Sequence, residues 1–371
     1  MVADFESMHG RAAWYTVESE HDIAPDALHV LACGEEGGGT EALIPVLSEL
    51  QRRGIGATAL VGGIGLARFG TVGVRHGLRL SPHDGEPGMD VANGLLLSPS
   101  YDGGMEEYLM SRYAGAPAVL TEDYYESSRY VIARALANGL DVPLICTVDN
   151  EAVRLISRRF SDVTAETRVT GSPAFDVLAD EDTAVAARHV KAGLGLVDGQ
   201  KLAVFLMPNL HHTQLAAEVA ASCHGLIGDD VVLTARAHPA DSLSSEDFTW
   251  IFSGVPYVES TDYTPDEVAA AADLVIVQRS THGLRAALRQ KPSISLREYV
   301  PDEFTLPLVD AGASVEVPST AVGPMILELL QGTSQRCINL RAAMQPYEID
   351  GKAAARVADI VCELMGNEKV T

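Results

Sequence analysis

Short apolar segments alternate with longer amphipathic segments along this chain, and the alternation begins twice. The first series opens at residues 27–33 and continues into a helix-like stretch over residues 41–50; the second opens at residues 202–207. Apolar residues at helical spacing after each short apolar run are typical of strand–helix–strand units, whose strands are parallel. The pattern predicts an α/β fold of two Rossmann-like parallel-sheet domains facing across a cleft. Further strands are expected at residues 57–61, 95–97, 117–120, 142–147, 168–171, 231–234, 257–258, 274–277 and 293–296.

A change of pattern near residue 181 marks the predicted domain boundary. A charged helical stretch over about residues 181–194 precedes the glycine-containing segment 195–199, and the strand pattern restarts after it. A chain of 371 residues exceeds the size at which one hydrophobic core keeps growing. Two domains are therefore expected, residues 1–180 and 181–350. The last expected helix, 351–366, has no strand after it and can pack back on the first domain.

A glycine-rich loop, residues 34–39, follows the first expected strand. Glycines at that place let a ligand approach the backbone, and the following helix start supplies free amides. The loop matches neither G-x-G-x-x-G nor the Walker A pattern, so a ligand-binding loop and a plain flexible turn both stay open. Candidates for a general base are Glu35 and Glu36 in this loop and Glu122 and Asp123 after a later strand.

Basic and polar residues follow three expected strands of the second half. Arg236 and His238 end one strand at alternate positions, so their side chains point the same way, and a guanidinium binds phosphate oxygens in bidentate fashion. Residues 279–282, Arg-Ser-Thr-His, lie between a strand and a helix, where Ser280 or Thr281 can cap the helix and its amides can bind an anion. Asn209 follows the first strand of this half. We expect a phosphate site here.

Composition excludes several classes of protein. The formal net charge of −24 disfavours a broad nucleic-acid surface. No apolar run reaches the length of a membrane span, and the acidic start lacks the order of a secretion signal, so a cytoplasmic location is expected. The five cysteines are widely spaced and predict neither a disulfide framework nor a zinc site. No metal-binding pattern is present.

The order of these motifs resembles the GT-B glycosyltransferase superfamily, including its relative, the non-hydrolysing UDP-N-acetylglucosamine 2-epimerase. Residues 34–50 resemble the opening loop and helix of the family. Residues 168–178 resemble its V-x-G-x-P-x-x-D signature, and residues 236–239 its strand-end basic motif. Residues 264–296 resemble its donor-binding strand–helix–strand unit. Arg285 departs from the family, because many members carry a ribose-binding glutamate there.

The resemblance implies a metal-independent glycosyltransferase without a cofactor, which moves a sugar from a UDP-linked nucleotide-sugar donor to a small-molecule or glycan acceptor. Glu36, Asp123 and His238 are the implied catalytic residues, and Gly37, Gly38 and Gly39 the acceptor loop. The implied donor-binding residues are Asn209, Arg236, His238, Arg279, Ser280, Thr281 and His282. A UDP-N-acetylglucosamine 2-epimerase, a glycerophosphate transferase-like enzyme and a non-catalytic nucleotide-sugar binder remain alternatives. A homodimer also stays open.

Overall fold

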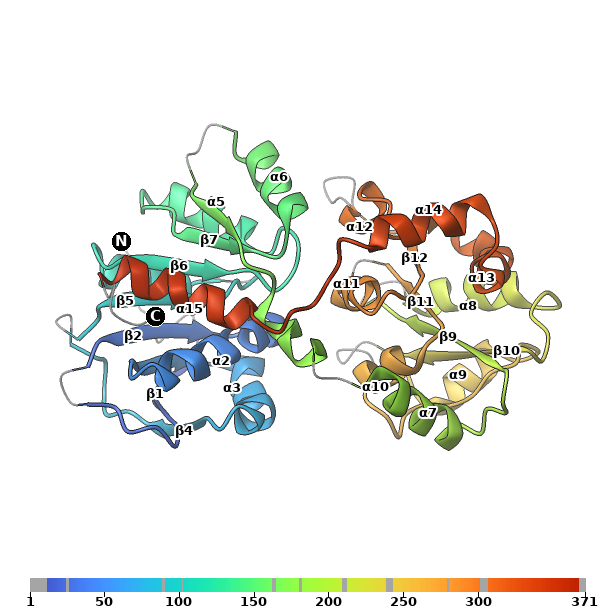
Figure 1. The fold of residues 1–371 in the computed structure, drawn as a ribbon, viewed down its shortest axis with the longest axis horizontal. Coiled ribbons are helices and arrows are strands. Elements are labelled where there is room, and N and C mark those ends of the chain that lie inside the picture. Colours follow the sequence, from blue (N-terminus) through green and yellow to red (C-terminus); the bar gives the residue numbers. More distant parts are fainter. Residues whose placement is uncertain are drawn as a thin grey trace. The chain divides into compact units, whose positions relative to one another are not determined.

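The computed structural model describes residues 12–24, 27–88, 91–101, 103–161, 165–179, 182–208, 212–237, 243–278, 280–300 and 306–366, without the side chains of residues 183, 212 and 245. The chain forms two compact units (Figure 1). Unit 1 comprises Met1–Asp180 together with Ile349–Thr371, and unit 2 comprises Glu181–Glu348. The C-terminal segment therefore returns to the unit in which the chain starts.

The described residues of unit 1 form an eight-stranded sheet in the order β4-β1-β3-β2-β5-β6-β7-β8. Strands β3, β2, β5, β6, β7 and β8 are parallel, and β1 pairs antiparallel with both β3 and β4. Its strands are β1 (Ala13–Glu18), β2 (His29–Gly34), β3 (Gly56–Val61), β4 (Arg79–Pro82), β5 (Gly94–Leu97), β6 (Ala118–Thr121), β7 (Leu144–Thr147) and β8 (Thr167–Val169). Its α-helices are α2 (Gly37–Arg52), α3 (Gly63–Arg68), α4 (Met105–Arg112), α5 (Arg129–Ala137), α6 (Asn150–Arg159) and α15 (Ala353–Leu364).

Strand β2 shows how this sheet is buried on both faces. Val30 and Ala32 belong to a core cluster with residues of α2 and α15, whereas Leu31 and Cys33 belong to a second cluster with residues of α4 and α5. Successive side chains of a strand point to opposite faces, so helices cover both sides of the sheet. Helix α15 is part of this core, and Arg53 at the end of α2 pairs with its Asp359 at 2.6 Å.

Unit 2 has a five-stranded sheet in the order β10-β9-β11-β12-β13, and every pair within it is parallel. Its described strands are β9 (Lys201–Leu206), β10 (Val231–Arg236), β11 (Leu274–Val277), β12 (Ser293–Leu296) and β13 (Val315–Val317). Its described α-helices are α7 (Thr183–Gly193), α8 (His212–Cys223), α9 (Ser245–Ile251), α10 (Pro265–Ala271), α11 (Thr281–Leu288), α12 (Pro307–Asp310), α13 (Val322–Gln331) and α14 (Gln335–Met344).

The predicted α/β class with two mostly parallel sheets is confirmed. Three of the described strands were not predicted, namely β1, β4 and β13. Most side chains of β1 and of the edge strand β4 are exposed or half-buried and alternate less clearly than those of the buried strands, so the period-2 signal is weak there. The expected strand at residues 257–258 is wrong, since only an isolated bridge joins Tyr257 to Leu233.

Candidate functional site

Four strands of unit 1 end at one edge of the sheet and bring polar side chains there. Glu36 follows β2, residues 98–101 follow β5, Glu122 and Asp123 follow β6, and Asp149 follows β7. These strands are parallel neighbours, so their carboxyl ends share an edge. In open α/β sheets, ligands bind at that edge. The sequence-predicted acids Glu36 and Asp123 are therefore on the same side of the unit.

The glycines at the start of α2 allow close packing against this edge. A Cβ placed on Gly38 would overlap the Asp123 Oδ2 atom. A Cβ on Gly39 would lie 2.8 Å from the carbonyl oxygen of Pro99, and one on Gly37 would lie 3.3 Å from Arg68 Nε. Gly38 and Gly39 are thus required by the Asp123 carboxylate and the β5 loop, whatever ligand the loop binds. The carboxylate also lies where the positive end of the helix dipole stabilises an anion.

Glu36 fixes the neighbouring loop. It is the N-cap residue of α2 but makes no side-chain cap bond to that helix. Instead its Oε1 accepts the backbone N–H of Tyr101, which follows β5. The predicted catalytic role of Glu36 is therefore accompanied by a clear structural role.

Glu122 is the most perturbed acid of this edge. Its side chain is buried, and its Oε1 accepts bonds from the Ser128 hydroxyl at 2.6 Å and the Ser128 N–H at 3.2 Å. Its Oε2 has no hydrogen-bond partner among the described residues. Burial, assisted by the negative charges of Asp123 and Asp149, raises the pKa of Glu122 to about 8. Glu122 is therefore protonated at neutral pH, a property that depends on its buried surroundings.

Two further carboxyls beside it are also shifted. Burial raises the pKa of Asp123, although hydrogen bonds from Ser127 and from backbone amides oppose the shift. Burial likewise raises the pKa of Asp149, whose Oδ2 accepts the Tyr125 hydroxyl at 2.5 Å. Carboxyls with raised pKa values at a ligand edge are suited to proton transfer near neutral pH.

In unit 2, Ser280 caps helix α11 directly after β11. Its Oγ accepts the His282 N–H at 3.3 Å and lies 3.2 Å from His282 Nδ1. The cap predicted at Ser280 or Thr281 is thus formed by Ser280, and Thr281 is the first helical residue. A capped start of an eight-residue helix leaves further amides directed at the strand edge.

Asp266 at the start of α10 holds the side chains of α11. It accepts Arg285 at 2.6 Å and lies 3.3 Å from His282 Nε2. Burial alone would raise the pKa of Asp266, but His282 and Arg285 outweigh it and hold that pKa well below its usual range. Both ring nitrogens of His282 thus have protein partners. No sequence signal links Asp266 to residues 16 and 19 positions later, so this pairing was missed.

Arg236 ends β10, two strands from β11 in the sheet. Its Nη1 donates to the Ser260 carbonyl at 2.8 Å, and its Nε has no hydrogen-bond partner among the described residues. The parallel sheet brings Arg236, Ser280, Thr281 and His282 to one edge. The predicted residues Asn209, His238 and Arg279 lie outside the described residues.

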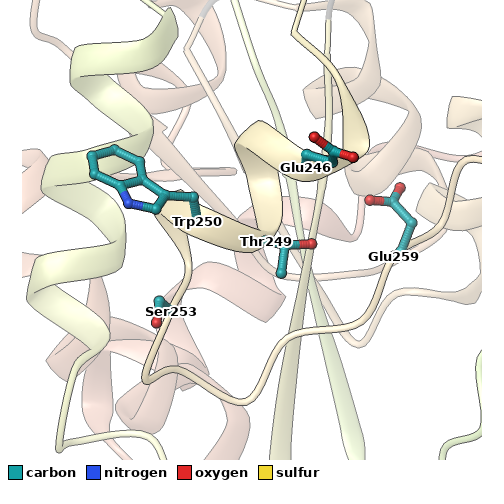
Figure 2. A pocket seen from close by; sticks show the side chains of 5 residues that line it. All are labelled: Glu246, Thr249, Trp250, Ser253 and Glu259. Atoms are coloured by element: carbon teal, nitrogen blue, oxygen red, sulfur yellow. The ribbon is translucent and has the colours of Figure 1, made fainter.

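An open pocket of about 480 Å³ lies elsewhere in unit 2, beside α9 (Figure 2). The residues that line it are Glu246, Thr249, Trp250, Ser253 and Glu259. None of them was predicted as a site residue. The two carboxylates repel a diphosphate, so this pocket is not suited to the nucleotide-binding role expected of the unit.

Two further findings concern the whole described chain. Its five cysteines are all buried and free. Among the described residues, the helices are too short or too polar to cross a membrane.

Comparison with known proteins adds a structural relationship. No protein-family profile and no curated protein matches the sequence. The UDP-GlcNAc 2-epimerase from Neisseria meningitidis bound to UDP-GlcNAc is similar in structure, with a TM-score of 0.66 and 14% identity over 90% of this chain and 100% of that chain. The calicheamicin glycosyltransferase CalG4 gives a TM-score of 0.56 and 11% identity, over 93% and 100% of the two chains. The wall teichoic acid polymerase TagF gives a TM-score of 0.53 and 10% identity, over 93% and 90%.

These similarities define the fold of the chain. It shares the two-domain α/β fold of these proteins, so the fold that the resemblance implied is confirmed. The identities of 10–14% are too low to carry a reaction from one protein to another.

Proposed function

We propose that this chain is a glycosyltransferase that moves a sugar from a UDP-linked donor to an acceptor, with unit 2 binding the donor and unit 1 the acceptor. One observation carries the proposal: helix α11, capped by Ser280, starts at the carboxyl edge of an all-parallel sheet that also presents Arg236. The start of a helix beside an arginine is suited to bind a diphosphate.

The donor site would act by stabilising the leaving group. Negative charge develops on the β-phosphate as the bond between the sugar and UDP breaks. The amides of α11 and the Arg236 guanidinium lower the energy of that charge, with Arg279 and His238 as further candidates. Asp266 gives His282 and Arg285 a positioning role, because it engages both side chains. No metal ion takes part in this scheme.

The acceptor site would supply the base. Asp123 accepts the proton of the acceptor hydroxyl while that oxygen attacks the anomeric carbon and UDP departs. Its raised pKa makes it a stronger base than an ordinary aspartate. Glu122 beside it is protonated at neutral pH and therefore adds no second charge at the reacting oxygen.

The first test is ligand binding, followed by turnover. UDP at about 100 times its dissociation constant should add about 2.7 kcal/mol of stability, measured as a thermal shift against CDP and ADP.

UDP release from UDP-glucose and UDP-GlcNAc should then depend on an added acceptor. Asp123→Asn should lower that rate about 100-fold or more, whereas the exposed Asp141→Asn should not change it. Turnover by Asp123→Asn at the unsubstituted rate would exclude Asp123 as the base.

A UDP-N-acetylglucosamine 2-epimerase is the second candidate. The TM-score of 0.66 to a 2-epimerase, above those to CalG4 and TagF, favours it, as does a buried acid that is protonated at neutral pH. Such an enzyme converts UDP-GlcNAc with no acceptor present and exchanges the C2 proton with solvent. Proton NMR of UDP-GlcNAc in D2O separates the two reactions. Stabilisation by UDP without either reaction would identify a non-catalytic binder.

A further inference from the structure

Tyr101 is the most exposed aromatic side chain in the described part of unit 1. It is 61% exposed and follows β5 at the carboxyl edge of the sheet. Ligands of open α/β sheets bind at this edge, so the exposed ring lies where a ligand can pack on it.

The backbone of Tyr101 is fixed on both sides. Glu36 accepts its N–H, and Arg134 of α5 donates to its carbonyl oxygen at 3.2 Å. Arg134 also donates to the Ser100 carbonyl at 3.2 Å and to Glu107 at 2.6 Å. The backbone that carries the exposed ring is therefore held in place, so a ligand that packs on the ring loses little binding free energy to ordering of the loop.

The ring itself is held by a second tyrosine. The centroids of Tyr101 and Tyr130 lie 4.6 Å apart in an edge-to-face arrangement. On Tyr130, the buried Arg129 guanidinium lies 4.4 Å from the ring centroid. Arg129, Tyr130 and Tyr101 thus form a cluster of successive contacts in which Tyr101 is the exposed member, and the orientation of that ring is set before any ligand arrives.

The charges around the cluster of Arg129, Tyr130 and Tyr101 select the class of ligand. Glu36 contacts the Tyr101 backbone, and Asp123 packs on Gly38, two residues after Glu36. These carboxylates repel phosphate, whereas the Arg129 guanidinium on the Tyr130 ring repels a cation. A neutral ligand with hydroxyl donors and an apolar face is compatible with both. A pyranose ring has that composition, because its C–H face packs on an aromatic ring and its hydroxyls donate to carboxylates.

We propose that Tyr101, supported by Tyr130, is the platform on which the acceptor binds, and that the acceptor is a neutral saccharide. This rests on the proposed transferase function and names the substrate class of its acceptor site. Tyr101 is a binding residue here, and the proton transfer stays with Asp123.

The test uses the full chain and an array of neutral mono- and oligosaccharides, followed by titration of the best-bound saccharide. The unsubstituted protein should bind at least one of them. Tyr101→Ala and Tyr101→Leu should weaken that binding tenfold or more, and Tyr101→Phe should stay within about twofold of the unsubstituted protein. Trp250→Ala removes an aromatic ring of similar exposure in unit 2 and should have no effect.

Several results would overturn the proposal that Tyr101 is the acceptor platform. The first three are no binding of any saccharide, unchanged saccharide affinity in both Tyr101→Ala and Tyr101→Leu, and a loss of affinity in Tyr101→Phe equal to that in Tyr101→Ala. A fourth is loss of the UDP thermal shift in Tyr101→Ala, because it would place the nucleotide on this ring. Tyr101→Leu keeps an apolar contact to Tyr130 and guards against misfolding of the alanine variant. The donor proposal fails separately, if UDP does not stabilise the unsubstituted protein while saccharide binding still depends on Tyr101.

Discussion

The Asp123 carboxylate packs on Gly38, at a distance that leaves no room for a Cβ atom. The contact joins the loop after β6 to the first turn of α2, so it places the proposed base and the acceptor loop in one rigid unit. A glycine at this position serves the close approach of a side chain of the same protein, and its backbone φ has no need to be positive.

Gly38→Ala should displace Asp123. We expect a loss of about 1–3 kcal/mol in the free energy of unfolding, the usual cost of overpacking, and a larger relative loss in turnover. Gly70→Ala is the matched control, because a Cβ there meets nothing within 4 Å, and it should leave both quantities unchanged. Urea unfolding and initial rates measure them. A Gly38→Ala protein with unsubstituted stability and rate would contradict the contact.

Glu122 should make the protein less stable as pH rises. Its pKa increases from the ordinary value of 4.5 to about 8 on folding, so between these values the folded state binds a proton that the unfolded state has lost. The free energy of unfolding should therefore fall by at most about 1.4 kcal/mol per pH unit over that window, with no further loss from this group above pH 8.

Glu122→Gln should remove this dependence, because glutamine resembles the protonated acid. Its stability relative to the unsubstituted protein should increase from pH 5 to pH 8.5, as measured by denaturant unfolding. Glu20→Gln, at an exposed glutamate, should show no such trend. Parallel stability profiles for the unsubstituted and Glu122→Gln proteins would show that Glu122 is charged in the folded state.

Ser280→Ala should weaken both α11 and UDP binding. Loss of the cap costs about 1 kcal/mol of stability, and loss of the hydroxyl with fraying of the first-turn amides should lower UDP affinity roughly three- to tenfold. Ser334→Ala removes the cap of α14 in the same unit and should lower stability alone. Calorimetric titration of UDP into both variants tests this prediction. If Ser280→Ala binds UDP as tightly as Ser334→Ala, the start of α11 is excluded as the diphosphate site.

Chelation should leave activity intact. Among the described residues, no group of three or more His, Cys, Asp or Glu side chains is arranged to hold a metal ion. The proposed donor site relies on helix amides and arginine, which stabilise the leaving diphosphate without a cation. Turnover in excess EDTA should equal turnover in MgCl2. Activity that disappears with EDTA and returns with a divalent cation would refute this.

Local patterns were sufficient for the buried core of both sheets. The segments 202–207 and 274–277 are continuous apolar runs between helix-like stretches, and they form β9 and β11 at the centre of the unit 2 sheet. A helix cap at Ser280 or Thr281 was also predictable, because N-capping depends on residues within one helical turn. Strand β1 was not, because most of its side chains are exposed or half-buried and give only a weak period-2 signal.

The sequence by itself determined the α/β class, the central strands, the GT-B resemblance and a helix cap at Ser280 or Thr281, because each depends on residue spacing over short stretches. The tertiary structure alone decided which side chains face each other: Asp123 with Gly38, Asp266 with His282 and Arg285, and Tyr101 with Glu36. It also decided the protonation of Glu122, because a pKa follows from burial and neighbouring charge. Those contacts join residues brought together by the parallel sheets, and no local pattern encodes such distances.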